Sequence, residues 1–421
     1  MCEELTRRGF LRGSGVAILS LPFFQSAAFA KKEWKTKHVV MVAFAGGVRS
    51  RETIETPANV PNLMRIAEAG VVCPNVGVMN NGHFGATMSI FTGNREYLGI
   101  RENERSENPT VFEYARKGKS LPANAVWLST AGGAQQRNLV YSLNKDYGEQ
   151  YGANLIDADG LFNAEFRRVL ESYGQPSLPG QAEEDAMAKL RSSMTPPPGG
   201  AAGLNDPETL ARLQRYLLEE ISGKTTQITG PGAGDARALS VAVSVLRLFK
   251  PTLMGVVLQN ADIAHGSYNG YVEVIRRADE QLGRLWDSIQ NDPELRDSTT
   301  VMILPEFGRD RNLNQRNGLD HGDNSPELMK VSMVGAGPDF KKGRTVSAGL
   351  QSVDVCPTSS SPPATMSAPR PTTGCSSPTY SATNTGASST SISMSTCTMP
   401  SSSRSSISTC RIFRSGACGI R

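Results

Sequence analysis

The chain has 421 residues, of which 38% are hydrophobic and 20% are charged. This length is enough for one large globular domain or two smaller ones, and the composition is too polar for a protein with many membrane spans. The formal net charge of +4 is unevenly placed, because residues 357–421 hold five arginines and no acidic residue. The rest of the chain is close to neutral, which argues against binding of nucleic acid.

The N-terminal segment, residues 1–30, resembles a twin-arginine export signal. Arg7 and Arg8 precede an apolar run at residues 16–24, and Ala-Phe-Ala at 28–30 is a small-x-small cleavage pattern. The apolar run is too short to span a bilayer, so no stable membrane span is expected. The resemblance implies recognition by the twin-arginine export machinery and a periplasmic or secreted protein. A retained anchor and a chance basic start are the alternatives.

The residues that follow predict an α/β fold. Residues 38–44 form a continuous apolar run that stops at Gly46, which is typical of a strand buried on both faces of a parallel sheet. Residues 61–70 have Pro in the first turn and Gly at the end, which predicts a helix. Further strands are expected at 71–76, 122–129, 251–258, 299–304 and 330–334, and helices at 86–91 and 271–290. This alternation predicts an α/β/α sandwich with a mostly parallel central sheet, in which ligands bind beyond the carboxyl ends of the strands.

Two regions interrupt this pattern. Residues 135–235 are helical and rich in loops, with an amphipathic helix expected at 207–221, and we interpret them as an insertion or cap. Farther on, 29 of the 53 residues from 358 to 410 are Ser or Thr. Such a segment cannot build a core, and it is either a disordered tail or the product of a shifted reading frame, which resequencing would decide. The expected organisation is a signal peptide at 1–30, an α/β domain at 31–357 and this tail at 358–421.

The cysteines do not predict a disulfide scaffold. Of the seven, only Cys73 and Cys356 lie in the predicted α/β domain. We expect two packed thiols or a single bridge, since no pair has the spacing of a zinc ribbon.

The few histidines indicate where chemistry could occur. The chain has four: His38, His83, His265 and His321. His38 begins the first predicted strand and is expected to be an ordinary strand-end residue. The other three follow predicted strands, as do Asp262 and Glu306. Because the carboxyl ends of parallel strands meet at one edge of a sheet, we expect these groups to converge there on a divalent metal.

The order of these motifs resembles the alkaline phosphatase superfamily, which includes sulfatases, phosphodiesterases and phosphomutases. Residues 56–71 are similar to the family's TPNLDRLAREGV helix, and residues 88–93 (MSIFTG) to the LLTG end of its nucleophile helix. Four later stretches resemble the family's D…GH…Y…D…G, SDHG, HG and DVAPT motifs: residues 262–283, 300–308, 320–322 and 352–358. The resemblance covers about residues 38–115 and 250–358, and excludes the insertion and the tail.

The resemblance implies one metal site of the usual kind. Asp262, His265 and His321 match an Asp-His-His set that holds a divalent cation, expected to be zinc, although the first two are three residues apart here and four in the family. The second metal site of the family is altered. Ala45 stands in the region of its opening Asp, and Glu306-Phe307 replaces its Asp-His pair, so Glu306 is the remaining candidate ligand.

The resemblance also suggests residues that could act on a substrate. The family's nucleophile position falls on His83, which we expect to be a nucleophile, a base or an additional ligand. Arg49, Arg51 and Arg309 are candidate clamps for an anion, since guanidinium groups pair well with phosphate and sulfate oxygens.

Two functions follow from these observations. The first is an exported metal-dependent hydrolase that uses one divalent cation to act on a small anionic substrate, a phosphate or sulfate ester. The second is a non-catalytic periplasmic relative that keeps the fold for binding or assembly. The changes at Ala45, His83 and Phe307 favour the second, because two-metal ester chemistry would be impaired by the loss of one cation. The retained Asp-His-His set favours the first.

Overall fold

The computed structural model describes residues 34–97, 104–132, 134–157, 194–195 and 228–356. These residues belong to one compact unit that begins at Trp34. Across these ranges, no helix is long and apolar enough to cross a membrane. The export signal, the helix expected at 207–221 and the tail at 358–421 lie outside the described residues, as does most of the insertion.

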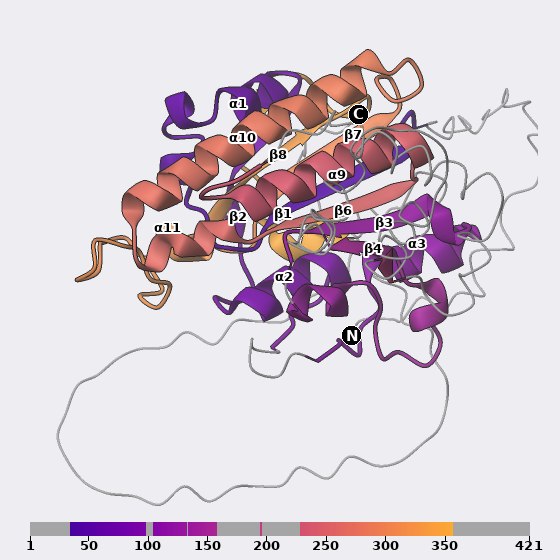
Figure 1. Cartoon of the computed structure of the whole chain (residues 1–421), viewed down its shortest axis with the longest axis horizontal. Helices are drawn as coiled ribbons and strands as arrows, with labels where there is room; N and C mark the ends of the chain where they lie inside the picture. Colours follow the sequence, from indigo (N-terminus) through magenta and orange to yellow (C-terminus); the bar gives the residue numbers. More distant parts are fainter. Residues whose placement is uncertain (1–33, 98–103, 133, 158–193, 196–227, 357–421) are drawn as a thin grey trace, which may run out of the picture. The chain divides into compact units, whose positions relative to one another are not determined.

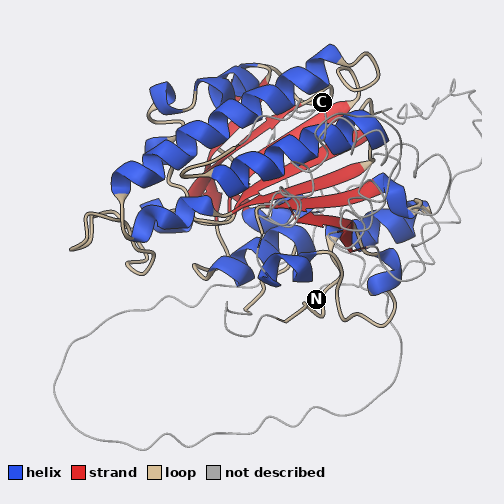
Figure 2. Cartoon of the chain, viewed as in Figure 1, coloured by secondary structure: helices blue, strands red, loops and turns tan. Residues whose placement is uncertain are grey.

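A mixed sheet forms the centre of the fold (Figures 1 and 2). Its strands lie in the order β10 (Leu350–Gln351), β2 (Gly70–Gly77), β8 (Lys330–Ala336), β7 (Thr299–Pro305), β1 (His38–Phe44), β6 (Leu253–Leu258), β3 (Val126–Thr130), β4 (Asn154–Asp157) and β5 (Met194–Thr195), with β9 (Arg344–Thr345) beside β2. β1 lies between β6 and β7 and is parallel to both. β8 runs antiparallel to β2 and β7, and most other pairs are parallel.

Helices cover both faces of this sheet. One layer contains α1 (Pro61–Glu68), α9 (Ala233–Phe249) and α10 (Tyr268–Asn291), and the other contains α2 (His83–Thr92) and α3 (Val111–Lys119), while α11 (Pro326–Met329) precedes β8 (Figure 1). β1 contributes to both cores because its side chains alternate. Val40 and Val42 pack in the core with α9 and α10, whereas Met41 and Ala43 pack in the core with α2 and α3. Burial on both faces explains the uninterrupted apolar sequence of this strand.

The predicted α/β/α sandwich with a mostly parallel central sheet is confirmed. The expected strand at 330–334 is present as β8, and the expected helix at 61–70 ends at Glu68 because Gly70 already begins β2. α3 and α9 were not predicted. Cys73 and Cys356 are both buried thiols, so the packed-thiol alternative holds.

Candidate metal centre

Four potential metal ligands meet beyond the carboxyl ends of the central strands. His83 is the first residue of α2, Asp262 and His265 lie in the 3-10 helix Asn260–His265 directly after β6, and His321 lies in the loop between β7 and β8. One ligand atom from each of these four residues lies within 4.8 Å of the others. The prediction that the segments after separate strands converge at one edge thus matches the geometry.

His83 presents one nitrogen to the cluster and anchors the other. Its Nδ1 lies 3.1 Å from the carbonyl oxygen of Ala45 and 2.6 Å from Oε1 of Glu306. Both are acceptors, so Nδ1 carries a proton. Nε2 lies 3.0 Å from Oδ1 of Asp262, in a geometry that makes no hydrogen bond, and it is buried without another partner in the described part of the chain. A buried ring nitrogen in this position fits a metal ligand.

The other two imidazoles follow the same pattern. Nδ1 of His265 lies 2.6 Å from a carboxylate oxygen of Asp320, and Nδ1 of His321 lies 2.9 Å from the carbonyl oxygen of Asn81. In each ring the acceptor holds the proton on Nδ1, so Nε2 faces the cluster as an acceptor; in His265 this Nε2 already accepts from Nη1 of Arg309 over 3.2 Å. Metal-binding histidines are usually fixed in this way by a carboxylate or a backbone carbonyl, which sets the tautomer and the ring orientation.

Glu306 lies behind His83 and is not among the four grouped ligands. It is fully buried at the end of β7, where it bonds to Nδ1 of His83 and accepts a short hydrogen bond from the hydroxyl of Thr87. Burial raises the pKa of Glu306 to about 7, although the contacts with His83 and Thr87 oppose this shift. The structure therefore places Glu306 as a support for His83, a different position from the metal ligand that the sequence suggested.

Arg309 brings a fixed positive charge to the edge of the cluster. Its guanidinium is fully buried and lies 2.6 Å from Oδ1 of Asp262 and 3.2 Å from Nε2 of His265. It also donates to the carbonyl oxygens of Gly46, Gly47 and Leu319. With its donors engaged in this way, Arg309 supplies charge at a fixed position.

The two glycines after β1 make this arrangement sterically feasible. A Cβ on Gly46 would lie 2.6 Å from the backbone nitrogen of Asp262, which is closer than real Cβ atoms approach. Gly47 has a φ of 68°, in the left-handed region that favours glycine. The chain can therefore turn tightly against the segment after β6 and direct two carbonyl groups at Arg309.

Arg49 and Arg51 lie differently from Arg309. Arg49 is buried and paired with Glu52, and its Nη1 donates to the carbonyl oxygens of Asp310 and Arg311 over 2.8 and 3.0 Å. These bonds tie the segment after β1 to the loop after β7 and occupy the guanidinium. Arg51 is exposed. We therefore treat Arg49 as structural and do not retain it as an anion clamp.

The charged groups around the cluster shift one another's protonation. Burial would lower the pKa of His83, but the carboxylates of Glu306 and Asp262 outweigh it and raise the pKa to about 10. Burial would raise the pKa of Asp262, but His83 and Arg309 hold it well below its usual range. Burial, together with the charges of His83 and Arg309, lowers the pKa of His321 to about 4. Without a cation, Asp262 is thus ionised beside protonated His83 and Arg309, while His321 is neutral.

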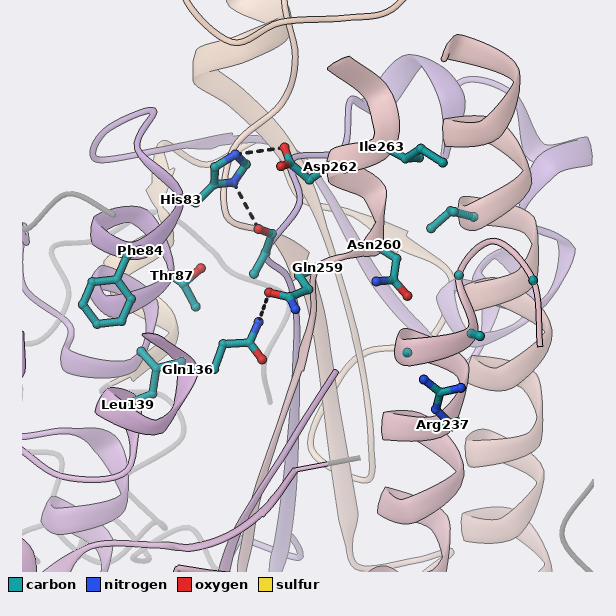
Figure 3. A pocket seen from close by; sticks show the side chains of 16 residues that line it. His83, Phe84, Thr87, Gln136, Leu139, Arg237, Gln259, Asn260, Asp262 and Ile263 are labelled. Carbon is teal, nitrogen blue, oxygen red and sulfur yellow. Dashed lines mark hydrogen bonds and ion pairs between the residues drawn. The ribbon is translucent and has the colours of Figure 1, made fainter. Parts of the chain in front are cut away.

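A pocket of about 580 Å³ adjoins the cluster and shares His83 and Asp262 with it (Figure 3). Its other walls come from α2, from the segment before β4, from the start of α9 and from the residues that follow β6. The pocket is large enough for a small organic molecule. The site therefore combines a cluster of nitrogen and oxygen ligands with an adjoining pocket that could hold a small molecule.

Sequence reasoning missed several supports of this centre. Asp320 precedes His321 in the sequence and could have been noticed as a partner for an imidazole. The carbonyl of Asn81 acts through its backbone, so its side-chain identity carries no signal. Thr87 lies within the helix expected at 86–91, and its bond to Glu306 depends on the packing of α2 against the end of β7.

A scan against protein-family models finds no match, and a search of curated protein sequences finds none either. Solved structures with a similar fold include a variant of alkaline phosphatase PafA, at 10% identity over 78% of this chain and 95% of that chain, with a TM-score of 0.49. The lipoteichoic acid synthase LtaP from Listeria monocytogenes has 10% identity over 76% of this chain and 70% of that one, with a TM-score of 0.45. A sulfatase from a Pseudoalteromonas species has 8% identity over 77% and 67%, also with a TM-score of 0.45. At identities of 8–10%, this similarity concerns the fold alone.

Proposed function

We propose that the chain is a metal-dependent hydrolase of small phosphate or sulfate esters that uses one divalent cation. The single observation that carries this proposal is the convergence of His83, Asp262, His265 and His321, each imidazole with its Nδ1 held by an oxygen acceptor. Three nitrogens and one carboxylate oxygen form a ligand set that suits zinc.

The four clustered residues provide imidazole nitrogens and a carboxylate oxygen, which are the donor types that bind zinc in proteins. In the role proposed here, His83 is the fourth ligand, which is one of the three roles left open by its sequence position. When bound, the cation would supply Lewis acidity to an ester or a water molecule, for which it would need one coordination position beyond the four protein ligands. Glu306 would hold the Nδ1 proton of His83, and Asp320 that of His265, so that both rings keep their orientation.

Arg309 would contribute electrostatically to the binding of an anionic ester. Its guanidinium is buried at the edge of the cluster, where a charge is screened much less than at the surface. It also orients Asp262 by the contact of 2.6 Å. Because most of its donors are used by carbonyl groups, its effect on a substrate would come from its field more than from a direct clamp.

We further propose that the protein is exported through the twin-arginine route to the periplasm or beyond. Support comes from Arg7 and Arg8, the apolar run at 16–24 and the cleavage pattern at 28–30. This route transports folded proteins and is compatible with a metal that is bound before export.

One observation favours the second function, a non-catalytic relative that keeps the fold for binding. Asp262 already lies within ion-pair distance of Arg309 and His83 without any cation, and its charge favours the protonated form of His83. A cation must therefore displace a proton from His83. In a binding protein, this network of ion pairs would serve as a rigid internal support.

Metal analysis of the purified protein, together with assays on aryl phosphate and aryl sulfate, separates the two functions. We expect one zinc per chain and turnover of at least one ester, and loss of both in His321→Ala. The matched control is His38→Ala, since His38 lies at the opposite end of β1 and bonds to the carbonyl of Pro251 over 2.9 Å. Bound zinc without turnover would support the binding protein, and protein that takes up no zinc would refute the metal site.

A further inference from the structure

The pocket beside the proposed metal centre has a polar wall and an apolar wall. Three side-chain amides belong to its lining, those of Gln136, Gln259 and Asn260. Phe84 and Leu139 contribute apolar surface to the same lining (Figure 3). A ligand that suits both walls carries hydrogen-bonding groups as well as carbon surface.

The amide of Gln136 is fixed in one orientation by a chain of hydrogen bonds that ends on a backbone carbonyl. The carbonyl of Gly132 can only accept, so Gln259 donates its Nε2 to it over 2.7 Å and turns its own Oε1 toward Gln136. Gln136 then donates its Nε2 to that oxygen, again over 2.7 Å (Figure 3). The amide oxygen of Gln136 consequently lies on the side away from Gln259.

This amide oxygen has no donor from the protein. Gln136 is only 6% exposed, and its Oε1 is buried without a hydrogen-bond partner within the described ranges of the chain. Leaving a buried acceptor unpaired is unfavourable, so a molecule that brings a donor to it gains a hydrogen bond that the protein does not supply. Because Gln136 lines the pocket, such a donor would come from a molecule bound there.

We infer that Gln136 is a specificity-determining residue, whose Oε1 accepts a hydrogen bond from a hydroxyl group on the alcohol part of the ester. The inference takes the nature of the ligand, an ester, from the proposed function. The recognition itself is a binding step and needs no turnover. A site built to pair with a hydroxyl group discriminates against an analogue that lacks it, because the acceptor then remains unpaired.

The test uses two esters with the same carbon skeleton, glycerol 2-phosphate and isopropyl phosphate, and the corresponding pair of sulfates. Only the glycerol esters carry hydroxyl groups. Binding to the zinc-loaded protein is measured by calorimetry, and kcat/KM wherever an ester is turned over. The variants are Gln136→Leu, which removes the amide, and Gln136→Asn, which shortens it by one methylene. Gln150→Leu is the matched control, because Gln150 is exposed in the 3-10 helix Glu149–Tyr151.

We expect the wild-type protein to prefer a glycerol ester by about 10- to 100-fold. Both Gln136 variants should lose most of this preference by weakening the glycerol ester, with isopropyl ester binding unchanged, and Gln150→Leu should keep it. Unfolding temperatures close to that of the wild type would show that the variants fold. Equal affinity of the wild type for the two esters, equal weakening of both by the variants, or no binding of either would overturn the inference.

The same data distinguish this inference from the proposed hydrolase. Gln136-dependent preference in binding, with no ester turned over, would support the inference and contradict the hydrolase. Turnover of both esters at equal kcat/KM in the wild type and in Gln136→Leu would support the hydrolase and overturn the inference.

Discussion

The support that Glu306 gives to His83 can be tested by Glu306→Gln. The amide has the same size, and its oxygen can still accept the Nδ1 proton over a distance similar to the present 2.6 Å. The ring should therefore stay in place while the negative charge behind it is lost. A hydrogen bond to a charged acceptor contributes about 1 kcal/mol more than a neutral one. If this free energy is lost from the metal-bound state, the affinity for zinc falls about fivefold, just below the usual range of about 10- to 100-fold for supporting residues.

Asp320→Asn provides the matched comparison. The bond from Asp320 to Nδ1 of His265 is also 2.6 Å long, so distance alone predicts equal effects for the two variants. Exposure differs, because the side chain of Glu306 is 0% exposed and that of Asp320 is 41% exposed. Water screens the exposed carboxylate, so the expected loss for Asp320→Asn is about threefold or less.

Zinc affinity is measured by competition against a chelator of known affinity, at one ionic strength and at a pH about one unit above the Glu306 pKa of about 7, where this carboxyl is ionised. Unfolding curves of both variants show whether the fold is intact. Glu306→Gln with wild-type zinc affinity would contradict the role of the buried carboxylate. Equal losses in the two variants would contradict the reasoning from exposure.

Two further predictions concern stability. The pKa of His83 is raised from 6.5 to about 10, so its protonated form stabilises the metal-free fold fully below about pH 6.5, and this contribution is lost as the pH rises through about 10. In chelator-treated protein, the free energy of unfolding obtained from thermal unfolding should fall by on the order of a few kcal/mol across this pH window. An equal fall in a His83→Gln variant would exclude His83 as its source. Asp279 on α10 accepts hydrogen bonds from the backbone nitrogens of Asn62 and Leu63 in the first turn of α1, over 3.0 and 2.7 Å. Asp279→Ala should therefore lower the free energy of unfolding by about 1–2 kcal/mol, measured by urea denaturation, and zinc affinity should stay unchanged; a loss of zinc binding with a native fold would contradict this separation.

Strand positions were accessible from the sequence because burial on both faces imposes long apolar runs, as in His38–Phe44 and Leu253–Leu258. The same logic located Asp262, His265 and His321, since polar residues that directly follow such strands lie at one sheet edge. The direction of β8 was not accessible in this way. An apolar run such as that of β8 has the same composition whether its neighbours run parallel or antiparallel.

The positions of the Glu306 and Arg309 side chains depend on tertiary packing, which residue spacing in the sequence does not predict. Glu306 follows a strand like the ligands do, but its carboxylate is turned toward His83 and Thr87 in the interior. Arg309 was a candidate clamp for an anion from the sequence, and the structure buries it among carbonyl groups of the loop after β1. The orientation of Gln136 likewise depends on the carbonyl of Gly132, reached through another side chain.

The proposed centre would have two sources of positive charge, a metal ion and the guanidinium of Arg309 buried between the two glycine carbonyls and Asp262. A metal ion exchanges with its surroundings, whereas a guanidinium is covalently part of the polypeptide. A chelator or a scarcity of zinc would therefore strip this site of only a portion of its positive potential. The positive potential from Arg309 is encoded in the sequence, so it is present in every copy of the chain whether or not zinc is bound.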